Sequence, residues 1–249
     1  METQGILYIA AGSKYIRAAM NSAESVRRHS PGLATHLYAD WQDRGFDFRR
    51  SPFPFTSVEA IDEPHRRSKV DYISRTPFDR TLYLDTDTAL NADVRSLFQV
   101  LDRFDIALCH AHRRNAVQRL APWRIALPPA FPQYNAGVIL FRRTPAVVRF
   151  LEEWSRSFHE AGFQQDQKTL RELLWLSDLR MATLPPEYNV RFMKYAWLWS
   201  SEEATAQILH LRRYHDGPLW RLKRSIRRLG RPLVRMGFDP RRWVSTAKK

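Results

Sequence analysis

The sequence lacks the features that mark several common protein classes. Its 249 residues include one cysteine, Cys109, which excludes an intramolecular disulfide framework and a multi-cysteine zinc or iron–sulfur site. Only 9 residues are glycine and 15 are proline, so the chain is neither collagen-like nor largely disordered. With 44% hydrophobic and 27% charged residues, it has the composition of an ordinary globular protein.

Long apolar runs are also missing. The longest, such as 6–11 and 137–141, are far shorter than the roughly 20 residues that a spanning helix needs. The first residues lack the basic start and the apolar stretch of about 7–15 residues that are typical of a secretory signal. We therefore expect no membrane-spanning segment, no signal peptide and a cytoplasmic location.

Acidic residues are scarce at the end of the chain. The net charge is +14, and residues 218–249 carry eleven basic residues against one acid, so this segment holds +10 of that charge. The body of the protein, residues 1–217, is therefore close to ordinary in charge. We expect a body domain over 1–217 and a basic tail over 218–249, with no specific nucleic-acid partner.

The tail has the pattern of an amphipathic helix. Pro218 suits a first helical position, and the leucines and isoleucine that follow recur at helical spacing among many arginines: Leu219, Leu222, Ile226 and Leu229. A basic amphipathic helix suits an anionic membrane surface, here the inner face of a membrane. Docking on the body and nonspecific nucleic-acid binding are the alternatives.

Short apolar runs alternate with helical patterns along the body. Strands are expected at 6–11, 35–39, 81–84, 106–109, 136–141, 181–184 and 208–211. Helices are expected at 13–28, capped by Ser13, and at 64–74, 146–160 and 167–176, with loops at 41–56 and 122–132. This alternation predicts an α/β fold with a mostly parallel sheet flanked by helices.

Two carboxylates follow the strand at 81–84. Asp85 and Asp87 are separated by one residue, at the strand end where open α/β sheets bind ligands. Two neighbouring carboxylates repel each other unless a cation lies between them, and carboxylate oxygens suit Mn²⁺ or Mg²⁺. The alternative is an exposed turn that uses aspartate for its turn chemistry.

Asp85-Thr86-Asp87 resembles the Asp-x-Asp motif of GT-A glycosyltransferases, whose fold is Rossmann-like, and especially the retaining glycogenin-like and galactosyltransferase (family 8-type) group. Further motifs resemble that family in the same order, over about residues 5–220. They are Ala10-Ala11-Gly12 with Tyr15, Lys69, Tyr134-Asn135-Ala136-Gly137-Val138, Asp166-Gln167, Tyr188-Asn189 and Ile208-Leu209-His210.

The resemblance implies a metal-dependent transfer of a sugar from a nucleotide-diphosphate sugar, expected to be a UDP-sugar, with retention. The acceptor would be a glycan or a lipid-linked glycan. The implied ligands of the Mn²⁺ or Mg²⁺ ion are Asp85, Asp87 and His210. The implied residues at the donor sugar, where catalysis takes place, are Asn135, Asp166 and Gln167.

The resemblance also implies a set of nucleotide-binding residues, which begins at the end of the first strand and includes positions further along the chain. There the family holds the base by backbone and an aromatic ring, and a basic residue meets the nucleotide or its pyrophosphate. The positions that match are Ala10, Ala11, Tyr15, Lys69, Asp85 and Asn189.

One segment departs from the family's pattern. Arg213 stands where the family has a glycine, and the lysine that contacts pyrophosphate is absent from its place. Arg212, Arg213 or Lys223 could replace it. The same shift makes His215 a rival of His210 as the metal ligand.

Each motif alone also admits a structural interpretation. Tyr15 could simply pack, Asp166 could cap a helix, and His210 could be a core histidine. A haloacid-dehalogenase-like phosphatase with Asp85 as nucleophile is a second enzyme class, but Ala89 stands where it needs threonine or valine. A non-enzymatic basic protein that binds a membrane or nucleic acid through the tail is a third possibility.

Overall fold

A computed structural model describes residues 2–113 and 121–215. The chain packs as two units, Met1–Leu211 and Arg212–Lys249, and the fold below is that of the first. The predicted boundary at 217/218 and the predicted basic tail helix lie outside the described residues. The part of the chain that the structure describes has no helix with the length and apolarity to cross a bilayer.

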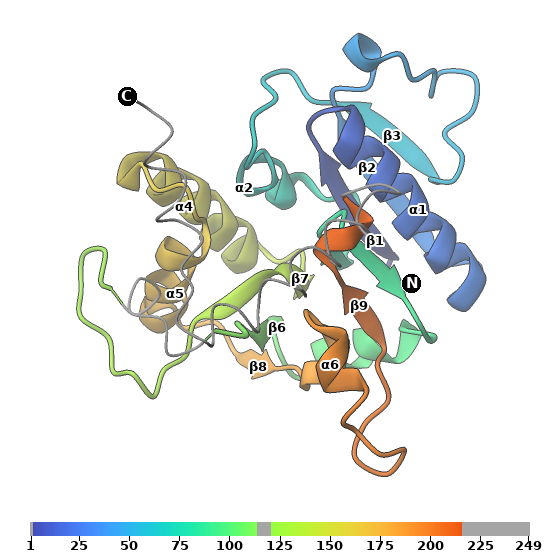
Figure 1. The fold of residues 1–249 in the computed structure, drawn as a ribbon. Helices are drawn as coiled ribbons and strands as arrows, with labels where there is room; N and C mark the ends of the chain where they lie inside the picture. The colour runs from blue at the N-terminus through green and yellow to red at the C-terminus, as the bar shows by residue number, and fades with distance from the viewer. Residues whose placement is uncertain (1, 114–120, 216–249) are drawn as a thin grey trace, which may run out of the picture. The chain divides into compact units, whose positions relative to one another are not determined.

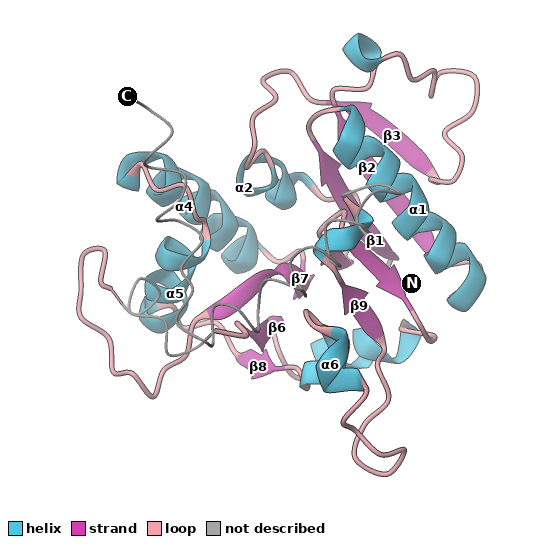
Figure 2. Ribbon diagram, in the orientation of Figure 1, coloured by secondary structure: helices cyan, strands magenta, loops and turns pink. Residues whose placement is uncertain are grey.

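A seven-stranded mixed sheet forms the centre of the first unit, with the order β3-β2-β1-β4-β7-β6-β8 (Figure 2). All neighbours pair in parallel except β7, which runs antiparallel to β4 and β6. This confirms the expected mostly parallel sheet. The strands are β1 (Gln4–Ala10), β2 (Ala34–Ala39), β3 (Ser57–Ala60), β4 (Arg80–Leu84), β6 (Ile106–His110), β7 (Tyr134–Arg142) and β8 (Met181–Thr183).

Helices cover both faces of this sheet (Figure 1). Successive strand residues point to opposite faces, so Ile6 and Tyr8 pack with α1 while Leu7 and Ile9 pack on the opposite side. The helices are α1 (Ser13–His29) on the first side and α2 (Lys69–Tyr72), α4 (Pro145–Ala161) and α5 (Gln167–Leu176) on the other. The short α6 (Met193–Ala196) comes later.

Local sequence explains the ends of α4. Thr144 caps it, since its hydroxyl accepts from the Val147 amide at 3.3 Å, and Pro145 takes the first helical position. Gly162 ends the helix with φ of 61°, a conformation that costs glycine little. The predicted helix at 146–160 is therefore confirmed.

Two expectations about helix starts were wrong. The helix expected at 64–74 is only α2 and a 3-10 turn at Ile73–Arg75, because Ser68 Oγ accepts from the His65 amide at 2.8 Å and holds a turn there. Ser13 does not cap α1. Gly12 holds the cap position with φ of 100°, fixed by its amide donating to Asp40 Oδ1 at 2.7 Å.

A small second sheet of two strands was not fully predicted. β5 (Thr88–Leu90) directly follows the two aspartates and pairs antiparallel with β9 (Ile208–His210). Thr88 lies opposite His210 in this pairing. Residues remote in sequence are thereby brought beside Asp87. The 3-10 helices of the first unit are Gln42–Arg44, Ile73–Arg75, Arg95–Asp102 and Pro186–Tyr188, and the described start of the second unit forms another, Arg212–Tyr214.

Candidate metal and donor-sugar site

Asp85 and Asp87 lie just past the end of β4, as the sequence predicts. The Asp85 amide donates to the Gly137 carbonyl of β7 at 2.8 Å, which extends the β4–β7 ladder to the first aspartate. The Asp87 carbonyl accepts from the Leu211 amide at 2.8 Å, which fixes the second against the end of β9. One backbone hydrogen bond thus holds each aspartate in place, Asp85 against β7 and Asp87 against the end of β9.

His210 completes a group of three potential metal ligands with these aspartates. Its Nε2 lies 2.9 Å from Asp87 Oδ1 and 3.5 Å from Asp85 Oδ2. One ligand atom from each residue lies within 4.8 Å of the other two. His210 and Asp87 are buried, and Asp85 is partly exposed, so the group opens to solvent at Asp85. The choice of His210 over His215 as the metal ligand remains a prediction.

A chain of hydrogen bonds fixes the tautomer of His210. The Gly137 amide donates to Asn135 Oδ1 at 3.1 Å, so the oxygen of that amide is identified. The NH₂ group of Asn189 must then donate to the same Asn135 oxygen, at 3.0 Å. The side-chain oxygen of Asn189 therefore faces His210 Nδ1, at 2.8 Å. His210 Nδ1 therefore carries a proton, and in the neutral ring the Nε2 lone pair points at the two carboxylates.

This arrangement fits a divalent cation. A lone pair and two carboxylates facing one another repel unless a positive charge lies among them. Metal-ligating histidines characteristically donate their other ring N–H to a second partner, as His210 does to the fully buried Asn189. The two carboxylates suit Mn²⁺ or Mg²⁺.

Glycine is required at position 137 because the group leaves no room for a side chain. A Cβ there would lie 2.2 Å from His210 Cε1 and 2.5 Å from Asp85 Oδ2. The Gly137 of the predicted Asn-Ala-Gly motif thus permits the histidine and the first aspartate to meet.

Lys69 joins the metal group to the start of α5. Its buried ammonium lies 3.1 Å from Asp85 Oδ1 and 2.9 Å from Asp166 Oδ2, and it donates to the Ala136 carbonyl at 2.8 Å. Burial alone would lower the pKa of Lys69, but the two carboxylates outweigh it and raise that pKa. The ammonium thus donates to Asp85 and Ala136 and forms an ion pair with Asp166, and the expected contact of Lys69 with a nucleotide remains a prediction.

Asp85 is held in its ionised form. Desolvation would raise its pKa, but the Lys69 ammonium outweighs this, and the pKa of Asp85 lies well below its usual range. Tyr83 adds a hydrogen bond from its hydroxyl to Asp85 Oδ1 at 2.8 Å. The sequence analysis missed Tyr83, although residues two apart on a strand share a face.

Asp166 and Gln167 lie at the start of α5. Asp166 occupies the cap position but makes no capping hydrogen bond, because its carboxylate pairs with Lys69. The Trp154 indole donates to the Asp166 carbonyl at 3.0 Å, which ties this start to α4. Gln167 is the first residue of the helix and is half-buried. Their contacts with a donor sugar remain predictions, as does that of Asn135.

The predicted nucleotide-binding residues lie at two places. Ala10 ends β1 and Ala11 follows it, while Tyr15 stands in the first turn of α1, partly buried against the core. Because β1 and β4 are parallel neighbours, this end of β1 lies at the same sheet edge as Asp85. Asn189 instead lies fully buried between Asn135 and His210, where it orients the histidine.

Arg191 is a charged residue at the site that the sequence analysis missed. Its Nη1 lies 3.6 Å from Asp87 Oδ2, and only 18% of its side chain is exposed. Its backbone N–H donates to His112 Nε2 at 3.3 Å. In the sequence, only the position of Arg191 two residues after Asn189 could have indicated a place at the site. In the structure, Val190 between them pairs with Leu209 of β9.

The fold is of the GT-A type. The chain belongs to the nucleotide-diphospho-sugar transferase family, whose sequence profile matches residues 75–217, more than half of its length. It is thus a member of a family of glycosyltransferase enzymes, which confirms the resemblance seen in the sequence. Membership of a family of sugar transferases supports neither the haloacid-dehalogenase-like phosphatase nor the non-enzymatic basic binding protein that the sequence left open. No curated protein matches the chain.

Solved structures show the same fold. The glycosyltransferase GlyE of Streptococcus pneumoniae TIGR4 is 18% identical with a TM-score of 0.56, over 84% of this chain and 55% of that one. Its apo form is 19% identical with a TM-score of 0.58, over 84% and 54%. The galactosyltransferase LgtC, in complex with donor and acceptor sugar analogs, is 15% identical with a TM-score of 0.57, over 83% and 86%. This chain therefore spans about half the length of GlyE.

Proposed function

We propose that this protein transfers a sugar from a nucleotide-diphosphate sugar, expected to be a UDP-sugar, to a glycan or lipid-linked glycan acceptor with retention. Asp85, Asp87 and His210 would hold the Mn²⁺ or Mg²⁺ ion that the reaction requires. The observation that carries the proposal is that His210 Nδ1 bonds to Asn189 while its Nε2 faces both carboxylates. This is the orientation that a metal-ligating histidine needs.

The chemistry follows from charge. Asp85, Asp87 and His210 would hold the divalent ion, which would supply positive charge to the diphosphate leaving group as the glycosidic bond breaks. Lys69 keeps Asp85 ionised and, through its ion pairs with both, holds Asp85 and Asp166 at a fixed separation. Asn135, Asp166 and Gln167 are proposed to hold the sugar hydroxyls, and such positioning contributes much of the catalysis in reactions of this kind.

A donor screen tests the proposed activity. We expect nucleotide release from a UDP-sugar in the presence of Mn²⁺, and no release in EDTA. The screen includes GDP- and TDP-sugars and a phosphomonoester, and NMR of the product reports the anomeric configuration. Release of inorganic phosphate from the phosphomonoester alone, or full activity in EDTA, would overturn the proposal.

Arg191 is proposed to contact the donor diphosphate in place of the family's missing lysine. A guanidinium has five N–H donors, and the contact with Asp87 leaves most of them for phosphate oxygens. Arg191→Gln should weaken UDP binding in Mn²⁺ by about 10- to 100-fold, the range of a charge-assisted hydrogen bond, with Arg191→Lys in between. Calorimetry measures this.

Arg156 provides the control for this prediction. It pairs with Glu153 on the exposed surface of α4, so Arg156→Gln removes the same charge and should leave UDP affinity unchanged. Equal affinities for the Arg191→Gln variant and the parent protein would show that another residue meets the diphosphate.

The basic tail is proposed to bind an anionic membrane surface, which would place the enzyme at the inner face of a membrane. Its charge of +10 supports this, since each basic residue near such a surface contributes about 1 kcal/mol, screened by salt. The full chain should float with anionic but not neutral liposomes at low salt, and a chain ending at residue 216 should not. Equal flotation of both chains would refute the role of the tail.

A further inference from the structure

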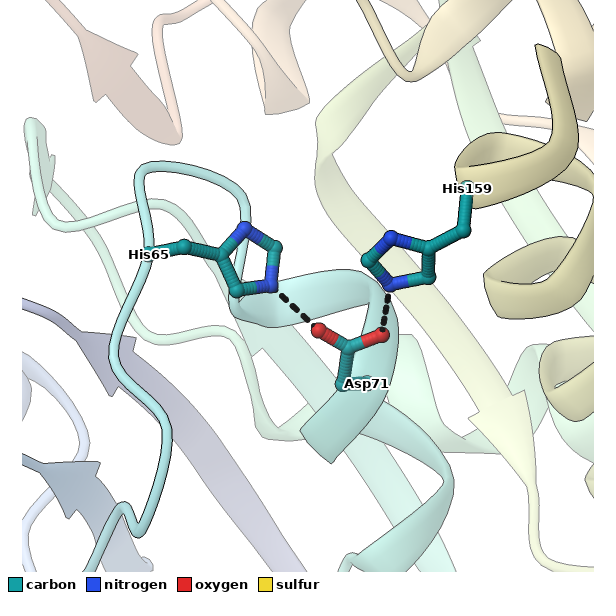
Figure 3. A group of neighbouring side chains, drawn as sticks. All are labelled: His65, Asp71 and His159. Carbon is teal, nitrogen blue, oxygen red and sulfur yellow. Dashed lines mark hydrogen bonds and ion pairs between the residues drawn. The ribbon is translucent and has the colours of Figure 1, made fainter. Parts of the chain in front are cut away.

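Two histidines and an aspartate form a second group of potential metal ligands (Figure 3). His65 lies in the turn before α2, Asp71 on α2, and His159 in the last turn of α4. His159 Nε2 lies 2.7 Å from Asp71 Oδ1, and His65 Nε2 contacts Asp71 Oδ2. One ligand atom from each residue lies within 4.8 Å of the other two.

This cluster is separate from the donor site, although both use α2. Lys69 and Asp71 are two residues apart, and residues at that spacing in a helix do not share a face. Lys69 meets Asp85 and Asp166, whereas Asp71 turns to α4, where it also accepts from Ser155 Oγ. The site described above therefore does not account for the cluster.

Charge and access at the cluster suit a metal ion. Desolvation would raise the pKa of Asp71, but hydrogen bonds from Ser155, His65 and His159 outweigh it and lower that pKa, so the carboxyl is ionised at neutral pH. The side chains of His65 and His159 are 37% and 54% exposed, so an ion can reach both imidazoles from solvent.

We propose that His65, Asp71 and His159 bind Zn²⁺, with a fourth position open to water. Two imidazoles and a carboxylate are a ligand set that Zn²⁺ accepts, whereas Mg²⁺ and Mn²⁺ prefer the oxygen-rich pair Asp85 and Asp87. Zinc bonds of about 2.0–2.2 Å place tetrahedral ligand atoms roughly 3.3 Å apart. The contacts here need to open by up to about 1 Å, which the partly exposed imidazoles of His65 and His159 allow.

Zinc binding costs three hydrogen bonds. Those between Asp71 and the Nε2 atoms of His65 and His159 are replaced by bonds to the ion, and the third is at His65 Nδ1. The Arg67 amide donates to His65 Nδ1 at 3.2 Å, so in the neutral ring the proton is on Nε2 and points at Asp71. When Nε2 binds the ion, that proton moves to Nδ1, and the contact with Arg67 is lost. Both groups are near solvent and can bond water instead, so this loss is small beside three metal–ligand bonds.

The ion would join two elements that position the donor site. α2 carries Lys69, and α4 carries Trp154, whose indole holds the Asp166 carbonyl. A zinc bridge between α2 and α4 would therefore fix the partners of the Lys69–Asp166 ion pair. The inference about zinc binding itself does not depend on the proposed transferase activity.

Cobalt titration of the full, untagged chain tests the site, because four-coordinate Co²⁺ absorbs visible light and substitutes for Zn²⁺. The background is Asp87→Asn, which disables the other group of ligands. We expect one equivalent of Co²⁺, displaced by Zn²⁺ but not by Mg²⁺. His159→Gln and His65→Gln should each weaken binding at least about 100-fold.

Two further variants make the outcome decisive. His29→Gln removes a histidine at the end of α1 and should bind Co²⁺ as the background does. His159→Cys supplies a thiolate in the same place and should restore binding with a thiolate-to-cobalt absorption band. The proposal is overturned if the Asp87→Asn chain takes up no Co²⁺, or if His65→Gln and His159→Gln bind it as well as that chain does.

Discussion

Asp87→Asn is expected to reduce Mn²⁺-dependent nucleotide release by about 1000-fold, the loss that follows removal of a major charge-stabilising group. Asp87 Oδ1 lies 2.9 Å from His210 Nε2, so the change removes the ligand charge next to the histidine. The amide has nearly the same shape, and the loss of a carboxylate near Asp85 relieves repulsion, so the protein should remain folded. A coupled assay for UDP measures the rate, and thermal unfolding checks the fold.

Asp178→Asn is the matched control for this prediction. Asp178 is exposed between α5 and β8, so the variant makes the same chemical change away from the site and should keep full activity. Activity of the Asp87→Asn variant within a factor of ten of the parent protein would show that the Asp-x-Asp pair does not hold the essential ion.

Gly137→Ala should also cost at least about 100-fold in Mn²⁺ affinity and in activity. The added methyl group would meet His210 Cε1 at 2.2 Å and Asp85 Oδ2 at 2.5 Å, distances at which one of these side chains must move. Displacing a metal ligand is more damaging than altering a residue behind it, where losses of 10- to 100-fold are usual.

A double-mutant cycle with His210→Ala separates this effect from general damage. If the methyl group acts by displacing the histidine, Gly137→Ala should add little to the loss that His210→Ala already causes. Additive losses, or wild-type Mn²⁺ affinity in the Gly137→Ala variant, would mean that the site tolerates the methyl group and that its geometry differs from that described.

The sequence analysis identified the parts of the site that follow regular strands. Asp85 and Asp87 come directly after an apolar run, and the rule for parallel sheets places such residues at the ligand-binding edge. His210 was identified as a metal ligand by the resemblance to the glycosyltransferase family, and not from the hydrophobic pattern of the sequence. Its place beside Asp87 depends on β5 and β9, two strands of three residues each that are too short to give a periodic signal.

The interactions that orient these ligands could not be predicted in the same way. The proton position on His210 depends on side chains of Asn135 and Asn189, which belong to separate segments and meet only in the folded protein. The same is true of the ion pair between Lys69 and Asp166. A motif names each of these residues, but their contacts follow from the tertiary packing.

The error over 64–74 has a local cause. A single helix was expected over these residues, but Ser68 uses its hydroxyl to accept from the His65 amide and to donate to the His65 carbonyl at 2.7 Å. Such side-chain bonds compete with helical hydrogen bonds. The resulting turn brings His65 to Asp71, so the segment that departs from the helix prediction is the one that carries the proposed zinc site.

Mn²⁺ binding followed by electron paramagnetic resonance tests the central claim most directly. The free ion gives a six-line signal, and loss of that signal reports the bound fraction without any need for an acceptor. The account predicts one Mn²⁺ per chain, bound more tightly in the presence of UDP, and little binding by the Asp87→Asn and His210→Ala variants at the same concentrations. Equal uptake of Mn²⁺ by the parent protein and both variants would contradict it.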